Sequence, residues 1–173
     1  MTIPAVRLNH AVLFVTDVAC SVRFWTAAFG MDVVARERGG SAVFLRLPRS
    51  GNHHDLGLFG LGADAAPKQR RAVGLYHLAW QVDTIDELAR ARDILLSLGA
   101  YTGESSHGAT KSVYGADPDG NAFEVLWMLP REDWGAYESA APVEPLDLNA
   151  ELQRWGGVPT AGRLTPGRVG DPS

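Results

Sequence analysis

The sequence predicts an α+β fold made of two tandem βαβββ modules, followed by a C-terminal extension. Two observations lead to this prediction: an internal repeat, and the same order of helical and strand-like patterns in each half. Residues 8–15 (LNHAVLFV) resemble residues 75–82 (LYHLAWQV), with corresponding positions 67 residues apart. A repeat at a fixed offset indicates that one structural unit occurs twice.

A helical pattern follows each copy of the repeated strand, over residues 17–29 in the first half and 84–98 in the second. Each pattern is followed by a glycine, the residue that most readily takes the left-handed conformation at a helix C-terminus. The second begins with TIDE at 84–87, which is a capping-box signature. Its apolar residues share one helical face: Leu88, Ala91, Leu95 and Leu98.

Three strand-like runs follow each helix, at 31–37, 41–48 and 53–61 in the first half, and at 100–105, 110–116 and 122–129 in the second. The last two are joined by DPDGN at 117–121, which has strong turn chemistry. We therefore divide one domain over 1–130 into a first module (6–61), a linker (62–72) and a second module (73–130).

Residues 131–173 form the extension, which contains five of the ten prolines. We expect a short helix over 146–155, anchoring contacts from Trp134 and Trp155, and mobility in the last dozen residues. The extension is expected to lie on the domain or on a partner subunit.

Composition excludes several classes of protein. With 16 Lys and Arg against 20 Asp and Glu, the net charge is −4, and no basic patch indicates nucleic-acid binding. No apolar run is long enough to span a membrane, and the N-terminus does not resemble a secretion signal, so we expect a cytoplasmic protein. A single cysteine, Cys20, excludes an internal disulfide framework and a multi-cysteine zinc site.

Two histidines occupy equivalent positions of the repeat, His10 and His77. Alternation along a strand places each on the face of its apolar neighbours, where it is either a hydrogen-bonded core residue or a ligand. Glu124 lies in an apolar strand, where it is either exposed or buried with a partner charge or a metal. Two imidazoles and one carboxylate suit Fe(II) oxygen chemistry, because they leave coordination positions open.

The duplicated pattern with these three residues resembles the vicinal oxygen chelate superfamily. That superfamily includes glyoxalase I, bleomycin-resistance proteins, fosfomycin-resistance transferases and type I extradiol ring-cleavage dioxygenases. The resemblance covers residues 6–130, and DPDGN at 117–121 followed by Glu124 is a superfamily signature. It implies a curved, cup-like mixed sheet around a metal held by His10, His77 and Glu124. The expected metal is Fe(II), with Mn(II), Zn(II) and Ni(II) as alternatives.

Further positions resemble the small one-domain extradiol dioxygenases. His54, within HHDLGLF at 53–59, and Tyr114, ten residues before Glu124, resemble their active-site histidine and tyrosine. His107 resembles their other active-site histidine, although it is closer to Tyr114 than in the well-known ring-cleaving enzymes. The resemblance implies that a catechol-type diol and O2 are the substrates. His54 would then act as acid or base, Tyr114 would bind a substrate oxygen, and His107 would accept or hold a proton.

Two alternatives and one further expectation remain. If Asp55, four residues after Gly51 as Glu124 is after Gly120, is a fourth ligand, the protein resembles a glyoxalase-type lyase or isomerase. Without a metal it would resemble a bleomycin-resistance binding protein. By analogy with the superfamily, we also expect a homodimer that uses residues 131–155, with neither nucleic acid nor membrane as a partner.

Overall fold

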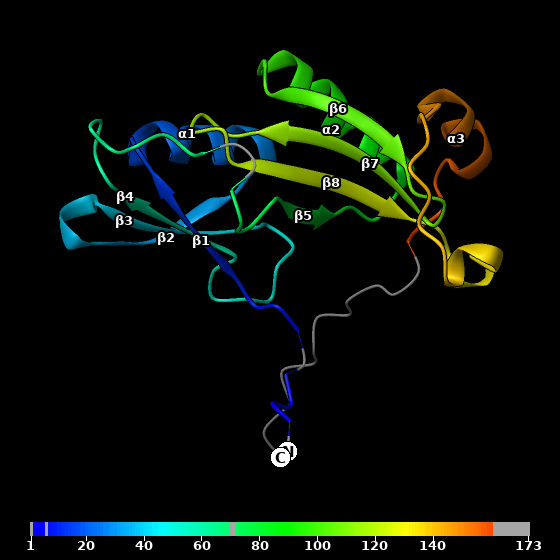
Figure 1. Cartoon of the computed structure of the whole chain (residues 1–173), viewed down its shortest axis with the longest axis horizontal. Coiled ribbons are helices and arrows are strands. Elements are labelled where there is room, and N and C mark those ends of the chain that lie inside the picture. Colours follow the sequence, from blue (N-terminus) through cyan, green and yellow to red (C-terminus); the bar gives the residue numbers. More distant parts are fainter. Residues whose placement is uncertain (1, 6, 70–71, 161–173) are drawn as a thin grey trace. The chain divides into compact units, whose positions relative to one another are not determined.

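The computed structural model describes residues 2–5, 7–69 and 72–160, which fall into two compact units. The first unit ends at Pro67 and the second begins at Lys68. Each unit contains a four-stranded sheet and a helix in the order βαβββ, as Figure 1 shows. The predicted α+β fold of two tandem modules is therefore confirmed.

The first sheet has the strand order β1-β4-β3-β2. Its elements are β1 (Ala11–Val15), α1 (Val18–Phe29), β2 (Asp32–Glu37), a 3₁₀ turn (Arg38–Gly40), β3 (Ala42–Arg46) and β4 (Leu56–Gly60). Strands β1 and β4 are parallel, and the other pairs are antiparallel. The Asp17 carboxylate accepts a hydrogen bond from the Cys20 amide and so caps α1, which ends at Gly30 with φ of 65°.

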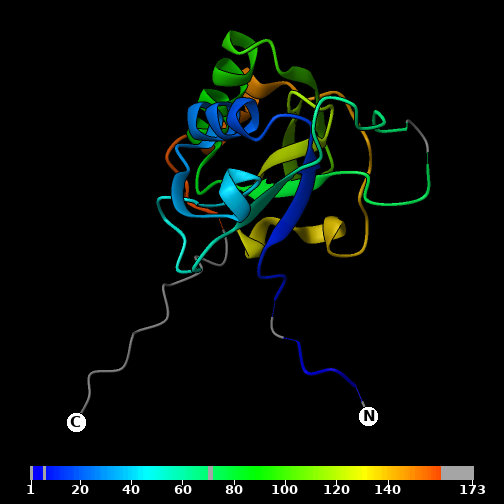
Figure 2. The same ribbon diagram turned by 90° about the vertical axis from the view of Figure 1, so that its left-hand side faces the viewer.

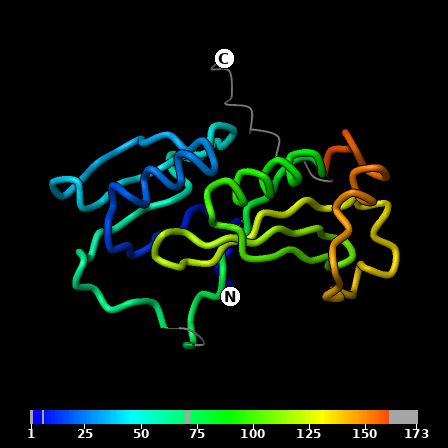
Figure 3. Tube along the Cα trace, turned by 90° about the horizontal axis from the view of Figure 1, so that it is seen from above, coloured from blue at the N-terminus to red at the C-terminus, as the bar shows by residue number. Residues whose placement is uncertain are grey.

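Helix α1 packs against one face of this sheet (Figures 2 and 3). The core of the unit includes Trp25 of α1 and five buried residues of the sheet: Leu13, Val15, Val43, Leu45 and Leu58. The other face carries Val12 and Phe14, which are 48% and 67% exposed. The sheet thus has a buried helix side and an open side.

The second sheet repeats this design with the order β5-β8-β7-β6. Its elements are β5 (Leu78–Gln81), α2 (Ile85–Ser97), β6 (Tyr101–Ser106), β7 (Thr110–Ala116) and β8 (Ala122–Met128). The predicted capping box forms in part: the Thr84 hydroxyl accepts from the Glu87 amide, and the Glu87 carboxylate accepts from the Asp83 amide. Helix α2 covers one face of the sheet. The buried side chains include Leu88 and Leu95 of the helix and Val113, Phe123, Val125 and Trp127 of the strands.

The first strand of each module is shorter than predicted. Strands β1 and β5 begin at Ala11 and Leu78, so His10 and His77 each lie one residue before a strand. Pairing gives the reason for the first module, because β1 hydrogen-bonds in parallel to β4, and β4 begins only at Leu56, opposite Ala11. Both histidines nevertheless keep equivalent places.

The extension packs on the second unit, beside the end of β8, as Figure 1 shows. It contains two 3₁₀ turns (Arg131–Asp133 and Gly135–Glu138) and helix α3 (Leu148–Trp155). The indole of Trp134 donates to the Leu129 carbonyl at 2.9 Å, and the ring of Trp155 lies 5.9 Å from that of Trp127. The mobility predicted for the last dozen residues concerns positions outside the described part of the chain. Within the described part, no helix has both the length and the apolar character needed to cross a bilayer.

Candidate functional site

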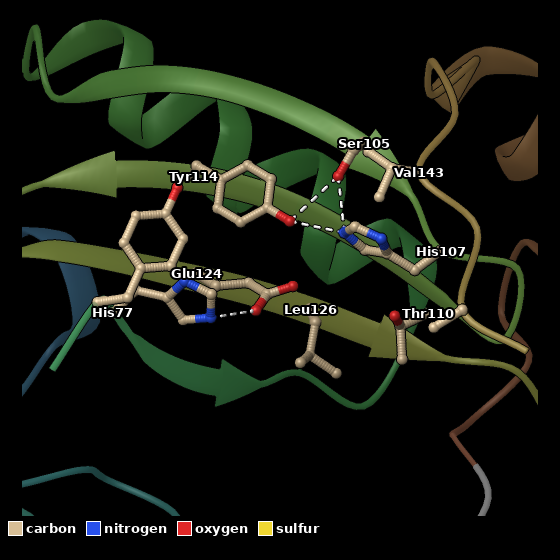
Figure 4. Close-up of a pocket in the computed structure, with 10 residues that line it drawn as sticks. His77, Ser105, His107, Thr110, Tyr114, Glu124, Leu126 and Val143 are labelled. Carbon is tan, nitrogen blue, oxygen red and sulfur yellow. Dashed lines mark hydrogen bonds and ion pairs between the residues drawn. The ribbon is translucent and has the colours of Figure 1, made fainter. Parts of the chain in front are cut away.

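His77 and Glu124 lie side by side on the open face of the second sheet. In the register, Ala79 on β5 is opposite Glu124 on β8. His77, one residue before β5, reaches the same face and lines the same cavity as Glu124. Its Nε2 atom is 3.1 Å from the Oε2 atom of Glu124, as Figure 4 shows.

This pair has the chemistry and spacing of metal ligands. Glu124 is 7% exposed, and within the described residues His77 is the ion-pair partner of its carboxylate. A carboxylate buried to this extent needs a compensating charge. Two ligands at right angles, each about 2.1 Å from a metal, are about 3.0 Å apart. The observed separation is close to that value, so the donor pair fits one cation.

A cavity of about 610 Å³ opens beside this pair in the second unit. Strands β6, β7 and β8 form its floor, and the extension supplies part of its wall. Polar and apolar side chains line it together, among them His77, Tyr114, Glu124, His107, Leu126 and Val143. Its size is that of a small-molecule site.

Tyr114, His107 and Ser105 form a hydrogen-bonded network inside the cavity. Tyr114 on β7 is directly opposite Glu124 on β8, so their side chains share a face. The Tyr114 hydroxyl is 2.7 Å from His107 Nε2 and 3.1 Å from the Ser105 hydroxyl, which is itself 2.8 Å from His107 Nε2 (Figure 4). The network brings two of the predicted catalytic residues, Tyr114 and His107, into direct contact.

The contacts of His107 indicate which groups in this network donate hydrogen bonds and which accept them. The Nδ1 atom of His107 is 2.9 Å from the carbonyl oxygen of Pro142, which can only accept. Nδ1 therefore carries a hydrogen, and when the ring is neutral, Nε2 can accept one from a hydroxyl. In this tautomer Tyr114 can donate its proton to His107 and use its oxygen to accept another.

In the first unit, His10 and His54 lie together. Their ring centroids are 4.5 Å apart, and the ring of Phe44 packs edge-on against His54 at 4.9 Å. His10 Nδ1 is 2.9 Å from the side-chain oxygen of Asn9, so Nδ1 donates and Nε2 keeps its lone pair. Metal-binding histidines are commonly oriented by such a partner on the second nitrogen. The desolvation of His54 by burial, followed by the neighbouring His10 and His53, lowers the pKa of its imidazole, while Asp55 opposes the shift.

Asp55 has a structural role, and its alignment with Glu124 is wrong. The offset of 67 residues continues into the last strands, because Val12 pairs with Gly57 as Ala79 pairs with Glu124. The counterpart of Glu124 is therefore Gly57, with the ring of Phe44 beside it. The comparison through Gly51 and Gly120 fails because the turn before β4 (47–55) is longer than the turn before β8 (117–121). Gly57 therefore lies six residues after Gly51, whereas Glu124 lies four residues after Gly120.

The Asp55 carboxylate holds that longer turn together. It accepts hydrogen bonds from the Leu47 amide at 2.8 Å, the Ser50 hydroxyl at 2.7 Å and the Asn52 side-chain amide at 2.8 Å. Its residue is 7% exposed. Because both of its oxygens accept hydrogen bonds from the turn, the Asp55 carboxylate stabilises the turn.

We expect Asp55→Ala to lower the free energy of unfolding by about 3 kcal/mol, because three partly buried donors lose a charged acceptor. Urea unfolding measures the loss, and Asp55→Asn, which keeps one acceptor oxygen, is the milder control. Bound metal, measured on the folded protein by elemental analysis, is expected to stay at the wild-type level. Loss of metal at unchanged stability would instead make Asp55 a ligand.

The structure thus groups the predicted residues within each unit: His77, Glu124, Tyr114 and His107 in the second, His10 and His54 in the first. The joining of the two groups around one metal stays a prediction; in the part of the chain that the structure describes, no three His, Cys, Asp or Glu side chains form a metal site.

Sequence reasoning missed Ser105 and the Pro142 carbonyl. Alternation along β6 offered a signal for Ser105, whereas no sequence signal marks a backbone carbonyl.

Residues 7–125 match the Glyoxalase/Bleomycin resistance protein/Dioxygenase superfamily. Together with the duplicated fold, this match shows that the chain belongs to that superfamily. The resemblance found in the sequence is thereby confirmed, and the extension after Met128 lies beyond the matched residues.

Curated relatives include dioxygenases named for catechols and for biphenyl-2,3-diol. The chain is 31% identical over 132 residues to 3-methylcatechol 2,3-dioxygenase of Pseudomonas putida, covering 69% of this chain and 41% of that protein. It is 30% identical over 124 residues to biphenyl-2,3-diol 1,2-dioxygenase 3 of Rhodococcus globerulus, covering 69% of this chain and 62% of that protein. The matches to curated relatives thus span between 23% and 62% of the relatives' lengths.

A solved glyoxylase/bleomycin resistance protein/dioxygenase domain from Frankia sp. EAN1pec has the same fold. It superposes with a TM-score of 0.60 at 22% sequence identity, covering 72% of this chain and 98% of that one. The similarity reaches across both modules at the level of the fold.

Proposed function

We propose that this chain is a metal-dependent extradiol dioxygenase that cleaves the ring of a catechol-type diol. The observation that carries the proposal is the buried Glu124 carboxylate, 3.1 Å from His77, at one end of a cavity that also holds a hydrogen-bonded tyrosine and histidine. The names of the curated relatives support the same class of substrate.

In this proposal His10, His77 and Glu124 hold the metal. An Fe(II) ion there would supply the redox chemistry that O2 requires, with Mn(II), Zn(II) and Ni(II) as alternatives. The first unit offers the free Nε2 of His10, and the second offers the imidazole and carboxylate that already lie together. Both imidazoles are neutral ligands, which leaves Glu124 as the negative one.

Tyr114 and His107 move a proton away from the substrate. A diol hydroxyl that reaches the Tyr114 oxygen can give it a proton while the tyrosine proton passes to His107 Nε2, 2.7 Å away. His107 can accept it because its other nitrogen, Nδ1, already donates to a carbonyl. The Ser105 hydroxyl lies within hydrogen-bonding distance of both groups and helps to hold them in place.

His54 is the proposed acid or base on the side of the first module. Its lowered pKa favours the neutral imidazole, which is the form that can take up a proton. Its ring lies against His10, which places it next to a proposed ligand.

The glyoxalase-type lyase is the second candidate, and the register argues against it. Such a lyase needs a fourth protein ligand from the first module, and the position equivalent to Glu124 there is Gly57. A metal-free binding protein has no use for the buried pair of donors that His77 and Glu124 make. A homodimer that uses residues 131–155 stays a prediction.

The test is oxygen uptake by the full chain, purified without air and loaded with Fe(II). We expect uptake with at least one of catechol, 3-methylcatechol and biphenyl-2,3-diol, and a ring-opened product that contains both atoms of ¹⁸O2. Protein loaded with Zn(II) is the matched control and is expected to be inactive, because zinc has no redox chemistry. A filled Fe(II) site with no uptake for any diol would favour the lyase.

A further inference from the structure

The extension reaches the candidate site through a short segment at 141–144. Ser106 at the end of β6 and Glu144 form a two-way bridge, in which each amide donates to the other residue's carbonyl at 2.9 Å. This bridge fixes the three preceding residues over the cavity, where Ala141 and Val143 line the wall. The segment lies outside the residues that match the superfamily, which end at position 125.

The first contribution of this segment is the carbonyl of Pro142. It accepts the hydrogen bond from His107 Nδ1, and so it selects the tautomer whose Nε2 faces Tyr114. Without this acceptor the Nδ1-protonated and Nε2-protonated forms of a neutral imidazole both become available. The Nε2-protonated form cannot accept the tyrosine proton, so the carbonyl decides what His107 can do.

The second contribution is the side chain of Val143. Figure 4 shows the His77–Glu124 pair at one end of the cavity and Val143 at the other. Val143 is 79% exposed although it is apolar and lines a cavity. An apolar ligand that covered it would remove this surface from water, which is favourable.

We propose that residues 141–143 of the extension complete the active site, with the Pro142 carbonyl as a positioning group for His107 and Val143 as the wall that selects substrates by size. A small diol held at the His77–Glu124 end leaves Val143 free, whereas a diol with a second ring extends to it. The tautomer does not depend on the dioxygenase proposal. The selection of substrates by size rests on it.

The positioning role is tested with Glu144→Pro against Glu144→Ala. Proline removes the amide that donates to Ser106 and restricts the residue before it, so the segment loses its bridge. Alanine keeps both backbone hydrogen bonds and is the matched control. In ¹⁵N-histidine spectra of the full chain, we expect His107 as the Nδ1–H tautomer in the wild type and in Glu144→Ala, and a mixture in Glu144→Pro.

Activity gives the second readout of the same pair. We expect kcat of Glu144→Pro to fall by about 10²-fold, the size of a general acid–base contribution, while Glu144→Ala stays near the wild type. An unchanged tautomer in a folded Glu144→Pro protein would overturn the positioning role whether or not the protein consumes O2. A changed tautomer with no diol oxidation in the wild type would leave the positioning role standing and reject the dioxygenase.

The wall is tested with Val143→Trp, which is compatible with folding because the valine side chain is exposed. We expect the KM for biphenyl-2,3-diol to rise by about tenfold, with the KM for catechol nearly unchanged. Leu96→Trp is the matched control, since Leu96 is 54% exposed on α2, which covers the other face of the sheet. Equal effects of Val143→Trp on both substrates would overturn the selection by size.

Discussion

Replacing Glu124 by alanine is expected to remove the bound metal while the protein stays folded. The carboxylate is the one charged ligand of the proposed set, and it lies on the sheet face opposite α2, beside a cavity. Loss of a residue that merely orients a ligand costs about 10–100-fold in metal affinity, so loss of the ligand itself is expected to cost more than about 100-fold. Elemental analysis after dialysis measures the metal, and circular dichroism checks the fold.

The matched control for this variant is Glu104→Ala. Glu104 belongs to the same sheet, but it pairs with Val113 in the register and its carboxylate lies 3.7 Å from Arg92 of α2, away from the cavity. We expect full metal content in this variant. If Glu124→Ala retains as much metal as Glu104→Ala, Glu124 is not a ligand and the candidate site loses its basis.

The elements that the sequence predicted well are those with local causes. Helix α1 begins after Asp17 and ends at Gly30 because capping and a left-handed glycine are short-range effects. The turn before β8 is equally local: the Asp117 carboxylate accepts from the amides of Asp119 and Asn121. Burial raises the pKa of Asp117, and the hydrogen bonds from Asn121 oppose the shift.

The errors concern register and contacts between distant segments. The longer turn before β4 made Asp55 look equivalent to Glu124, and strand pairing shows that Gly57 is the equivalent residue. The extension was expected to lie on the domain or on a partner subunit, but nothing in its composition marked the Pro142 carbonyl as a partner of His107. Hydrogen bonds between residues 35 positions apart depend on how the chain folds back, which composition does not encode.

These two corrections bear on the choice between lyase and dioxygenase. With Gly57 in place of a carboxylate, the proposed ligand set contains one negative charge and two neutral imidazoles. Such a set leaves positions open for two substrate oxygens and O2. In the proposed mechanism the protein supplies the proton acceptor through Tyr114 and His107, which are 2.7 Å apart. The charge of the proposed ligand set and the presence of a proton acceptor thus both favour the proposed dioxygenase over the lyase.

Replacing His10 by alanine is the second change with a large expected effect, because it asks whether both modules bind the metal. His10 belongs to the first unit, where Asn9 holds its Nδ1 and leaves Nε2 available. Since His77 and Glu124 belong to the second unit, the variant keeps that pair intact. We expect metal affinity to fall by more than about 100-fold, measured by competition with a chelator.

His53→Ala is the matched control, since His53 touches the same histidine cluster through its 3.0 Å contact with His54 but is not a proposed ligand. It should bind metal like the wild type. Wild-type affinity in His10→Ala, combined with loss in Glu124→Ala, would mean that the second module binds the metal without the first. The first module would then have a function other than metal binding, and His54, which lies against His10, would no longer be expected to lie beside the metal. Loss in both variants would show that each half of the repeat contributes ligands, which is the physical reason to retain two copies of one module.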